Sequence, residues 1–288
     1  MSETFPPPAF PPRLEIDGRP AGLEQVQALD LSPRGHFTAM QVRGGATLGL
    51  DFHLTRLDAA SRELWGTGLD PDLIRGYFRQ AIDGLPDASV RANVFVPGSG
   101  GPGGPGGPGG PGGPGGPAGT GAGAPSVMVS VRPPSAPPSR PQRLLSVPYQ
   151  RPLAHIKHAT GFGQNYFGGL ASGNGYDEAL FAGPDGAISE GSITNIAFLD
   201  GDAIVWPSAP ALRGVMMQVL QRELTRAGVP WRQAPVHLAD LPALGGALVS
   251  NSHGMAPVAS IDDLVLPTDA ELYATAAKLL AAAPYDPI

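Results

Sequence analysis

Three short segments of the sequence carry side chains whose types could do chemistry. The first, His155-Ile156-Lys157-His158, holds an isolated lysine in a chain that has few lysines. A lysine can react with the aldehyde of a cofactor once burial or neighbouring cations have depressed its ammonium towards neutrality. Lys157 is therefore a candidate for such a bond, although an isolated lysine is more often a solvated surface residue.

The second segment runs from Ile188 to Asn195 and places Glu190 before a glycine and several polar side chains, between two predicted strands. A carboxylate in this position can keep a pyridine nitrogen protonated, which makes the ring an electron sink for a substrate carbanion. A capped turn without any chemistry explains the same residues.

The third segment is Leu212-Arg213-Gly214-Val215-Met216, at the start of a predicted helix. A glycine there lets backbone N–H groups approach a phosphate, and the helix dipole favours the anion. An ordinary turn explains a glycine at this position equally well.

The elements that position these segments change in character along the chain. In the first half, alternating apolar residues predict strands and a helical apolar periodicity predicts two helices, which together indicate an α+β layer structure. The predicted strands are 13–17, a short strand after the turn Asp17-Gly18, 38–42, 46–50, 89–96 and 127–131, and the predicted helices are 53–65 and one that begins with Asp70 as cap and Pro71.

In the second half, after a proline-rich stretch at 133–148, strands punctuated by turns predict a twisted, mostly antiparallel sheet with helices around it. The predicted elements are strands 178–182, 193–199 and 203–206, a helix at about 214–227, and strands near Ala247 and Pro257.

A tract of Gly-Gly-Pro triplets at about residues 98–125 separates two of the predicted strands. It has nothing to bury, so we expect a solvated surface loop with polyproline character inside a hairpin connection, with a tethering or assembly role as the alternative. We expect a small domain at residues 1–145, which contains this insert, and a larger domain at residues 146–288.

Composition excludes several classes of function. A net charge of −6 leaves no basic stripe for nucleic-acid phosphates, and the absence of cysteine excludes disulfides, thiolate metal sites and cysteine nucleophiles. The N-terminus has no signal-peptide pattern, and no run of about 18 apolar residues occurs. We therefore expect a soluble, cytoplasmic protein that binds neither nucleic acid nor membrane.

Two other kinds of active site lack their motifs. The six histidines form no H-x-x-x-H or H-E-x-x-H pattern, and His155 and His158 have no accompanying carboxylate motif, so we expect no metal. The G-x-S-x-G elbow of a serine hydrolase does not occur either.

Taken in order, four motifs resemble those of the class IV aminotransferases, the fold type IV pyridoxal-phosphate enzymes that include branched-chain and D-amino-acid transaminases and aminodeoxychorismate lyase. The motifs are Phe52-His53-Leu54-Thr55-Arg56-Leu57, Ile156-Lys157, Ser189-Glu190-Gly191-Ser192 with Asn195, and Leu212-Arg213-Gly214-Val215. The resemblance spans nearly the whole chain, and the separation of Lys157 from Glu190, 190 − 157 = 33, is similar to that in the family. It implies a two-domain α+β fold whose larger C-terminal domain holds a pseudo-barrel sheet with flanking helices.

By this resemblance Lys157 would hold pyridoxal 5'-phosphate as a Schiff base and would move the proton at the substrate α-carbon. Glu190 would pair with the pyridine nitrogen, and Arg56 would bind the phosphate together with backbone N–H groups at the helix start and a side chain from Ser250-Asn251-Ser252. The expected cofactor-binding residues are Arg56, Lys157, Glu190, Ser192, Asn195, Gly214, Val215, Met216, Asn251 and Ser252.

The sequence departs from the family pattern mainly where substrate is chosen. Met216 and Met217 stand where most relatives have a threonine-containing run, which removes a side chain from phosphate binding. The stretch 158–166 is glycine-rich and lacks the usual Asn-Tyr soon after the lysine.

The segment 35–38, Gly-His-Phe-Thr, replaces the frequent Gly-Val-Phe-Glu, and the usual basic residue near Phe95 is missing. Arg91 is then the nearest cation for a substrate carboxylate, with Phe37 as a second candidate for substrate contact. An arginine in a half-buried strand more often pairs with an acidic neighbour.

The resemblance implies an aminotransferase that moves an amino group between an amino acid or amine and a 2-oxo acid, and it implies a homodimer. An aminodeoxychorismate lyase would use the same lysine, glutamate and phosphate site, so this activity remains the alternative. A non-catalytic binding or assembly protein that kept the fold is a third possibility, with the Gly-Gly-Pro insert as its working part.

Overall fold

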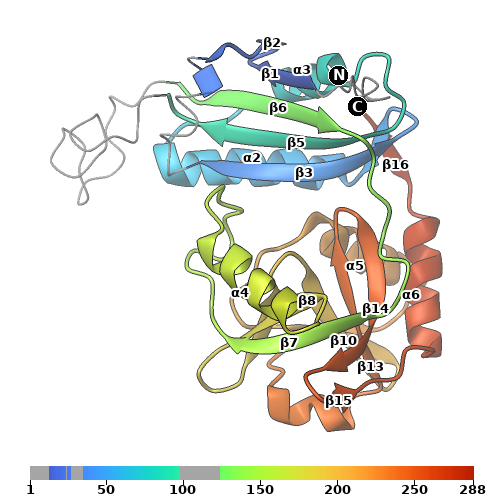
Figure 1. Cartoon of the computed structure of the whole chain (residues 1–288). Coiled ribbons are helices and arrows are strands. Elements are labelled where there is room, and N and C mark those ends of the chain that lie inside the picture. Colours follow the sequence, from blue (N-terminus) through green and yellow to red (C-terminus); the bar gives the residue numbers. More distant parts are fainter. Residues whose placement is uncertain (1–12, 24, 27–34, 98–123) are drawn as a thin grey trace, which may run out of the picture. The chain divides into compact units, whose positions relative to one another are not determined.

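The computed structural model describes residues 13–23, 25, 26, 35–97 and 124–288 (Figure 1). The predicted insert at 98–125 lies outside the described residues, except for its last two positions. The described chain forms two compact units: unit 1 holds the described residues up to Ser135 with His158–Thr160 and Asp286–Ile288, and unit 2 holds Ala136–Lys157 and Gly161–Tyr285. The division into domains at residue 145 stays a prediction.

Unit 1 is built on a seven-stranded sheet with the strand order β16-β4-β3-β5-β6-β1-β2. Its strands are β1 (Arg13–Ile16), β2 (Arg19–Pro20), β3 (His36–Arg43), β4 (Ala46–Leu48), β5 (Ala88–Phe95), β6 (Ser126–Arg132) and β16 (Tyr285–Pro287). Asp17 and Gly18 join β1 to β2 with φ values of 50° and 70°, as the hairpin turn predicted from the sequence requires.

Two helices, α2 (Leu50–Trp65) and α3 (Pro71–Ala81), bury their apolar sides against this sheet (Figure 1). The carboxylate of Asp70 accepts the N–H groups of Asp72 and Leu73, and Pro71 opens α3, so its predicted start is confirmed. The core between sheet and helices includes Met40, Val42, Leu57, Trp65, Ile74, Phe78, Val90 and Val129.

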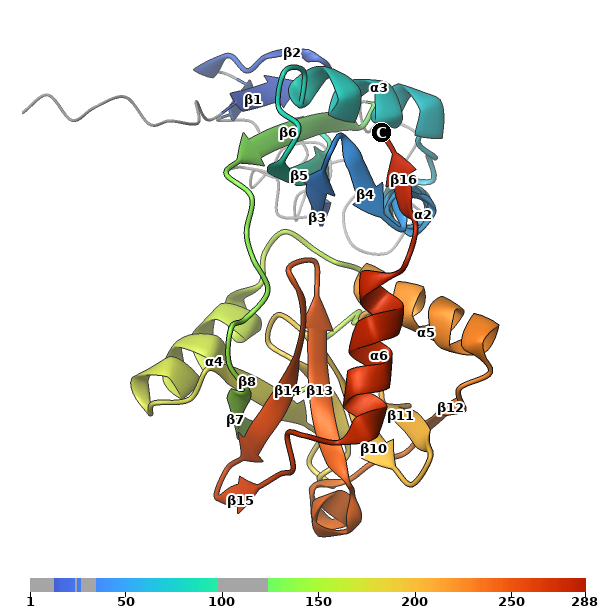
Figure 2. The same ribbon diagram turned by 90° about the vertical axis from the view of Figure 1, so that its right-hand side faces the viewer.

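Unit 2 is built on a nine-stranded mixed sheet with the order β12-β11-β10-β13-β14-β7-β8-β9, and β15 pairs with β14 (Figure 2). Its strands are β7 (Gln142–Pro148), β8 (Glu178–Ala182), β9 (Ile188–Gly191), β10 (Asn195–Asp200), β11 (Ala203–Pro207), β12 (Trp231–Ala234), β13 (Gly246–Asn251), β14 (Gly254–Ile261) and β15 (Leu264–Val265). The sheet curls into a half-barrel, as the predicted α+β fold class requires.

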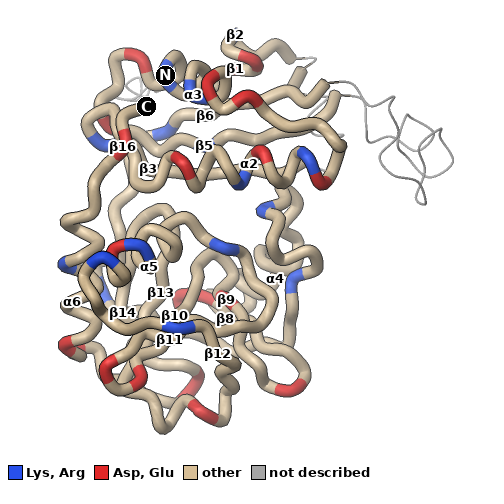
Figure 3. The backbone as a smooth tube through the Cα atoms, turned by 180° about the vertical axis from the view of Figure 1, so that it is seen from behind, with Lys and Arg blue, Asp and Glu red and all other residues tan. Residues whose placement is uncertain are grey.

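The helices of unit 2 are α4 (Phe162–Gly173), α5 (Val215–Ala227), α6 (Glu271–Ala281) and the 3-10 helix η1 (Leu238–Ala243). Helix α4 packs on β8, whereas α5 packs on β13 and on α6 (Figure 2). Acidic and basic positions are interspersed along the described chain of each unit (Figure 3).

The sequence patterns did not predict β7, α4 or α6. Strand β7 lies within the stretch described above as proline-rich, but its only proline is the last residue, so its other backbone N–H groups are free to pair with β8 and β14. The glycines of α4 obscured its helical pattern in the sequence. Gly163 is required there because a Cβ would lie 2.3 Å from the Tyr149 ring.

Among the described helices, none is both long and apolar enough to cross a membrane.

Candidate active site

Lys157 lies in unit 2, half-buried, in an irregular stretch between β7 and α4. The buried side chain of Arg151, six residues earlier, organises this stretch. Its Nη1 donates a hydrogen bond of 2.6 Å to the carbonyl of Ile156, and its Nη2 donates to the carbonyl of Ala154. Its Nε donates to Oε1 of Glu190 at 2.9 Å. One guanidinium thus joins the backbone before Lys157 to the carboxylate of Glu190.

Glu190 lies on β9, and both of its carboxylate oxygens accept hydrogen bonds. Oε1 is paired with Arg151, and Oε2 accepts the backbone N–H of Leu212 at 3.0 Å. The side chains of Arg151 and Glu190 are only 4% and 7% exposed, so water screens their charges little. The carboxylate is therefore fixed in place and electrostatically paired.

The start of α5 is fixed by Asn195, whose Nδ2 donates a hydrogen bond of 2.7 Å to the carbonyl of Leu212. A Cβ at position 214 would lie 1.9 Å from Oδ1 of Asn195, so only glycine fits there. No side chain caps the helix. The N–H groups of Val215 and Met216, in its first turn, have no partner within the helix and are available for an anion.

Strand β13 brings Ser250 opposite Asn195 in the sheet. The hydroxyl of Ser250 is buried and has no hydrogen-bond partner within the described part of the chain. Asn251 and Ser252 follow, and Oδ1 of Asn251 accepts the N–H of His253 at 2.8 Å. Ser250 thus offers a buried donor that is unused within the described part of the chain.

The turn after Glu190 is held by a second buried carboxylate, that of Glu178 at the start of β8. Its Oε1 accepts the N–H groups of Ile193 at 2.6 Å and Thr194 at 3.0 Å, and its Oε2 is 3.0 Å from Oγ1 of Thr194. Ser192 donates a longer bond of 3.4 Å. A Cβ at Gly191 would lie 2.4 Å from Oε1 of Glu178, so the turn needs glycine.

In unit 1, Arg56 projects from α2 into a buried polar cluster. Its guanidinium donates to Oγ1 of Thr38, which also shares a hydrogen bond of 2.6 Å with Nδ1 of His53, in a direction set by the His53 tautomer. Nε of Arg56 is buried without a hydrogen-bond partner among the described residues.

The electrostatics of this cluster favour the binding of an anion. Burial lowers the pKa of Arg56 to about 10. Burial, and secondly the Arg56 cation, lower the pKa of His36 to about 4, so His36 is neutral at pH 7. Arg56 is thus a buried cation that an anion would stabilise.

The two predicted substrate residues lie side by side on the other face of the unit 1 sheet. The guanidinium carbon of Arg91 is 3.7 Å from the centroid of the Phe37 ring, and Nε of Arg91 donates to Oδ1 of Asn93 at 3.1 Å. Burial, followed by the Arg132 cation, lowers the pKa of Arg91.

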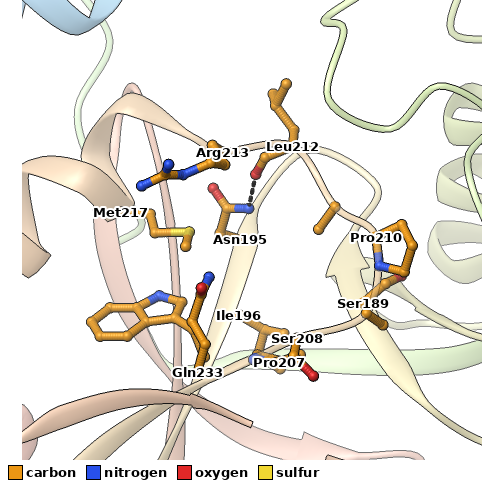
Figure 4. Close-up of a pocket in the computed structure, with 13 residues that line it drawn as sticks. Ser189, Asn195, Ile196, Pro207, Ser208, Pro210, Leu212, Arg213, Met217 and Gln233 are labelled. Atoms are coloured by element: carbon orange, nitrogen blue, oxygen red, sulfur yellow. Dashed lines mark hydrogen bonds between the residues drawn. The ribbon is translucent and has the colours of Figure 1, made fainter. Parts of the chain in front are cut away.

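A cavity of about 200 Å³ in unit 2 is lined by loop 207–213 and by neighbouring strands and α5 (Figure 4). Asn195 points from β10 to the loop carbonyl of Leu212, and Arg213 and Met217 lie on one side. Ser189 also lines the cavity.

The chain matches the family model of amino-transferase class IV over residues 35–261. It belongs to the class IV aminotransferase family. The resemblance predicted from the sequence is therefore confirmed, and with it the cofactor, because the family depends on pyridoxal phosphate. A comparison with curated proteins gave no match.

Solved structures of class IV enzymes share the fold. Among them are 4-amino-4-deoxychorismate lyase from Pseudomonas aeruginosa (24% identity, TM-score 0.73, 93% of this chain and 98% of that one) and a branched-chain aminotransferase from Thermoproteus uzoniensis (18%, 0.76, 93% and 95%). A hypothetical aminotransferase from Mycobacterium tuberculosis in its PLP-bound form is also similar (18%, 0.73, 96% and 94%).

The residues present in each unit fit this cofactor. In unit 2, the uncapped start of α5 and the unused hydroxyl of Ser250 are donors that suit a phosphate, and Glu190 is an acceptor that suits a pyridine N–H. In unit 1, Arg56 is a buried cation with an unused N–H group. The roles of the individual residues remain predictions.

Sequence reasoning did not find Arg151 or Glu178, the two residues that organise the site in unit 2. Glu178 could have been found, because it opens a strand in which every residue is buried, and a buried charge requires partners. Arg151 left no comparable pattern in the sequence.

The pKa of Glu178 predicts a pH-dependent stability. Burial raises it from 4.5 to about 7, against the opposing effect of its hydrogen bonds. Because the folded pKa exceeds the unfolded one, the contribution of Glu178 is fully present below about pH 4.5 and is lost as the pH rises through about 7. A shift of this size corresponds to about 3 kcal/mol.

Glu178→Gln should remove this dependence. The free energy of unfolding of the parent, relative to that of the variant, should fall by about 2 to 3 kcal/mol between pH 4.5 and pH 7.5 in denaturant titrations. Glu271→Gln, at the exposed start of α6, is the control. Equal pH dependence of parent and Glu178→Gln would show that the assigned shift is wrong.

Proposed function

We propose that this chain is a pyridoxal-phosphate-dependent aminotransferase that moves an amino group between an amino acid or amine and a 2-oxo acid. The observation that carries the proposal is the Arg151 guanidinium, which joins the backbone before Lys157 to the carboxylate of Glu190. A cofactor of this type needs a lysine for its aldehyde and an acidic partner for its ring nitrogen, both held at fixed positions.

When bound, pyridoxal phosphate supplies an aldehyde that accepts the amino group and a ring that withdraws electrons from the substrate α-carbon. Nζ of Lys157 would hold the aldehyde, and once the substrate amine has displaced it, the freed Lys157 amine would take and return the proton at that carbon as a general base and acid. Glu190 accepts the hydrogen bond of the ring nitrogen, and the Arg151 pair and the Leu212 N–H keep its carboxylate oriented.

The donors proposed to bind the phosphate are N–H and O–H groups that have no hydrogen-bond partner among the described residues. The N–H groups of Val215 and Met216 at the start of α5 bind it, supported by Gly214 and Asn195, which fix the backbone. The Ser250 hydroxyl supplies a further donor in unit 2. The phosphate-binding role of Arg56, which lies in unit 1, stays a prediction. Of the other predicted contacts, we keep Ser192, Asn251 and Ser252 as parts of the turns that border the site.

For the substrate, we propose Arg91 as the cation that binds a carboxylate and Phe37 as the apolar surface beside it. Among the described residues, the hydrogen-bond acceptor of Arg91 is the amide of Asn93 rather than a carboxylate, and the exposed Arg91 is accessible to a ligand. Such a cation favours a carboxylate ligand.

A carbon–oxygen lyase of the aminodeoxychorismate type is the second candidate, supported by the P. aeruginosa lyase among the similar structures. Both reactions use the same lysine, glutamate and phosphate donors. Amino transfer from a panel of donors to pyruvate or 2-oxoglutarate, assayed beside pyruvate release from aminodeoxychorismate, separates them. A protein active in neither assay and unable to take up the cofactor would instead be a non-catalytic binding protein.

We further propose that the chain forms a homodimer through α4. Phe162, Tyr166 and Leu170 recur every four residues along this helix and are 81%, 59% and 43% exposed. Ile193, in the turn held by Glu178, is 63% exposed. Neighbouring exposed apolar residues on one helix face favour association with a second copy.

Lys157 is one of only two lysines in the chain, which makes its predicted role easy to test. After incubation with pyridoxal phosphate, borohydride should fix the cofactor on the peptide that contains Lys157, as read by mass spectrometry. Lys157→Ala should lower turnover by at least about 10³-fold, because the proton carrier is lost. Lys278→Ala, on the exposed side of α6, is the matched control. Labelling of Lys278 alone would overturn the assignment.

Replacing Glu190 should impair the electron sink without removing the cofactor. Glu190→Gln keeps the size but lacks the charge that stabilises a protonated ring, so we expect turnover to fall by about 10²-fold while visible cofactor absorbance is retained. Stopped-flow and steady-state assays of the loaded enzyme measure this effect. Parental turnover in Glu190→Gln would show that Glu190 has a different role.

The dimer prediction is tested by placing a charge on the α4 stripe. Phe162→Asp should convert the dimer into a monomer in size-exclusion chromatography with light scattering, because a buried unpaired carboxylate destabilises an interface. Val265→Asp is the control, since Val265 is 79% exposed on β15, away from α4. A monomeric parent, or a dimeric Phe162→Asp variant, contradicts the prediction.

A further inference from the structure

We propose that Arg151 is a positioning residue that sets Lys157 and Glu190 relative to each other and thereby determines how firmly the cofactor is held. The inference rests on the proposed function, because it assigns Arg151 a role towards the same two residues. It goes further in naming one side chain on which both depend.

Arg151 first holds the backbone of the turn that precedes Lys157. The carbonyl of Ile156 belongs to the peptide group that also carries the N–H of Lys157, so the bond from Nη1 of Arg151 fixes the plane of that peptide. The bond from Nη2 to Ala154 holds a second point of the same turn. Two points of attachment fix where the Lys157 side chain starts.

The second step is that the turn before Lys157 has little backbone pairing of its own beyond the N–H of Ile156, which donates to the carbonyl of Leu153 at 2.9 Å. Residues 152–157 form neither helix nor strand, so their carbonyls have no ladder of N–H donors. Leu153 adopts a φ of 47°, a left-handed conformation that costs a non-glycine residue free energy. Ala154 and Ile156 are buried, at 5% and 2% exposure, so their carbonyls need a protein donor. Arg151 supplies it.

The third step is the charge of Arg151. A buried carboxylate requires an opposite charge, and Arg151 provides it for Glu190 at 2.9 Å. Each carboxylate oxygen has two lone pairs, and Arg151 and the Leu212 N–H use one on each. A lone pair therefore remains to accept a ring N–H, while the carboxylate cannot rotate away.

A lysine could not replace Arg151 fully. The planar fork of arginine reaches three acceptors in different directions, namely Glu190, Ile156 and Ala154. A lysine ammonium would keep the charge opposite Glu190 but would lose the simultaneous attachment of the turn. The two functions of Arg151 can thus be separated by substitution.

The test measures the dissociation constant of pyridoxal phosphate and the pH midpoint of the visible band of the loaded protein. Arg151→Met should weaken cofactor binding by about 10- to 100-fold, the range seen when an outer partner of a binding group is removed, and should shift the pH midpoint. Arg151→Lys should lie between parent and Arg151→Met. Val258→Ala, a core change in β14, controls for lost stability.

A double-mutant cycle with Glu190→Gln separates positioning from a general effect on folding. If Arg151 acts through Glu190, Arg151→Met should weaken cofactor binding much less in the Glu190→Gln background than in the parent. Independent effects of the two substitutions, or a parental dissociation constant and pH midpoint in Arg151→Met, would overturn the proposal. If the Met variant does not fold, the Lys variant must still show weaker binding than the parent.

Failure of the proposed function is a separate result. A parent protein that takes up no pyridoxal phosphate, or that is not labelled at Lys157 by borohydride, would overturn the proposed function and with it the role of Arg151. A parent that binds the cofactor while Arg151→Met binds it equally well would overturn the role of Arg151 alone.

Discussion

The buried ion pair between Arg151 and Glu190 is the interaction on which the candidate active site depends. Its charges are almost fully removed from water, so it holds only because further hydrogen bonds satisfy both partners. Those bonds reach the backbone before Lys157 on one side and the N–H of Leu212 on the other. A single pair thus ties the loop after β7 to strand β9 and to the segment that leads into α5.

Nearby, other buried polar side chains also hold turns in place by hydrogen bonds to their backbone groups. Glu178 gathers the N–H groups of Ile193 and Thr194, and Asn195 fixes the carbonyl of Leu212 before α5. A glycine lies where each of these side chains comes closest to the backbone: Gly191 beside Glu178 and Gly214 beside Asn195. The half-barrel sheet therefore supplies the frame, and the side chains of Arg151, Glu178 and Asn195 set the turns that carry the proposed chemistry.

Local patterns predicted much of this architecture. Apolar alternation and helix caps are patterns among residues that are close together in the sequence. Most strands and the helices α2, α3 and α5 could therefore be recognised from the sequence. Lys157 and Glu190 stood out through the order of their motifs. Arg151 and Glu178 did not, because their partners lie up to 39 and 16 residues away and meet them only after the sheet has folded.

In the proposed function, the Glu190 carboxylate, held by Arg151, keeps the ring nitrogen of the bound cofactor protonated. The ¹⁵N chemical shift of cofactor labelled at that nitrogen, bound to the parent protein and recorded across neutral pH, tests this most directly. We expect the shift of a protonated pyridine nitrogen in the parent protein, and its loss in Glu190→Gln. A shift typical of an unprotonated nitrogen in the parent protein would contradict it.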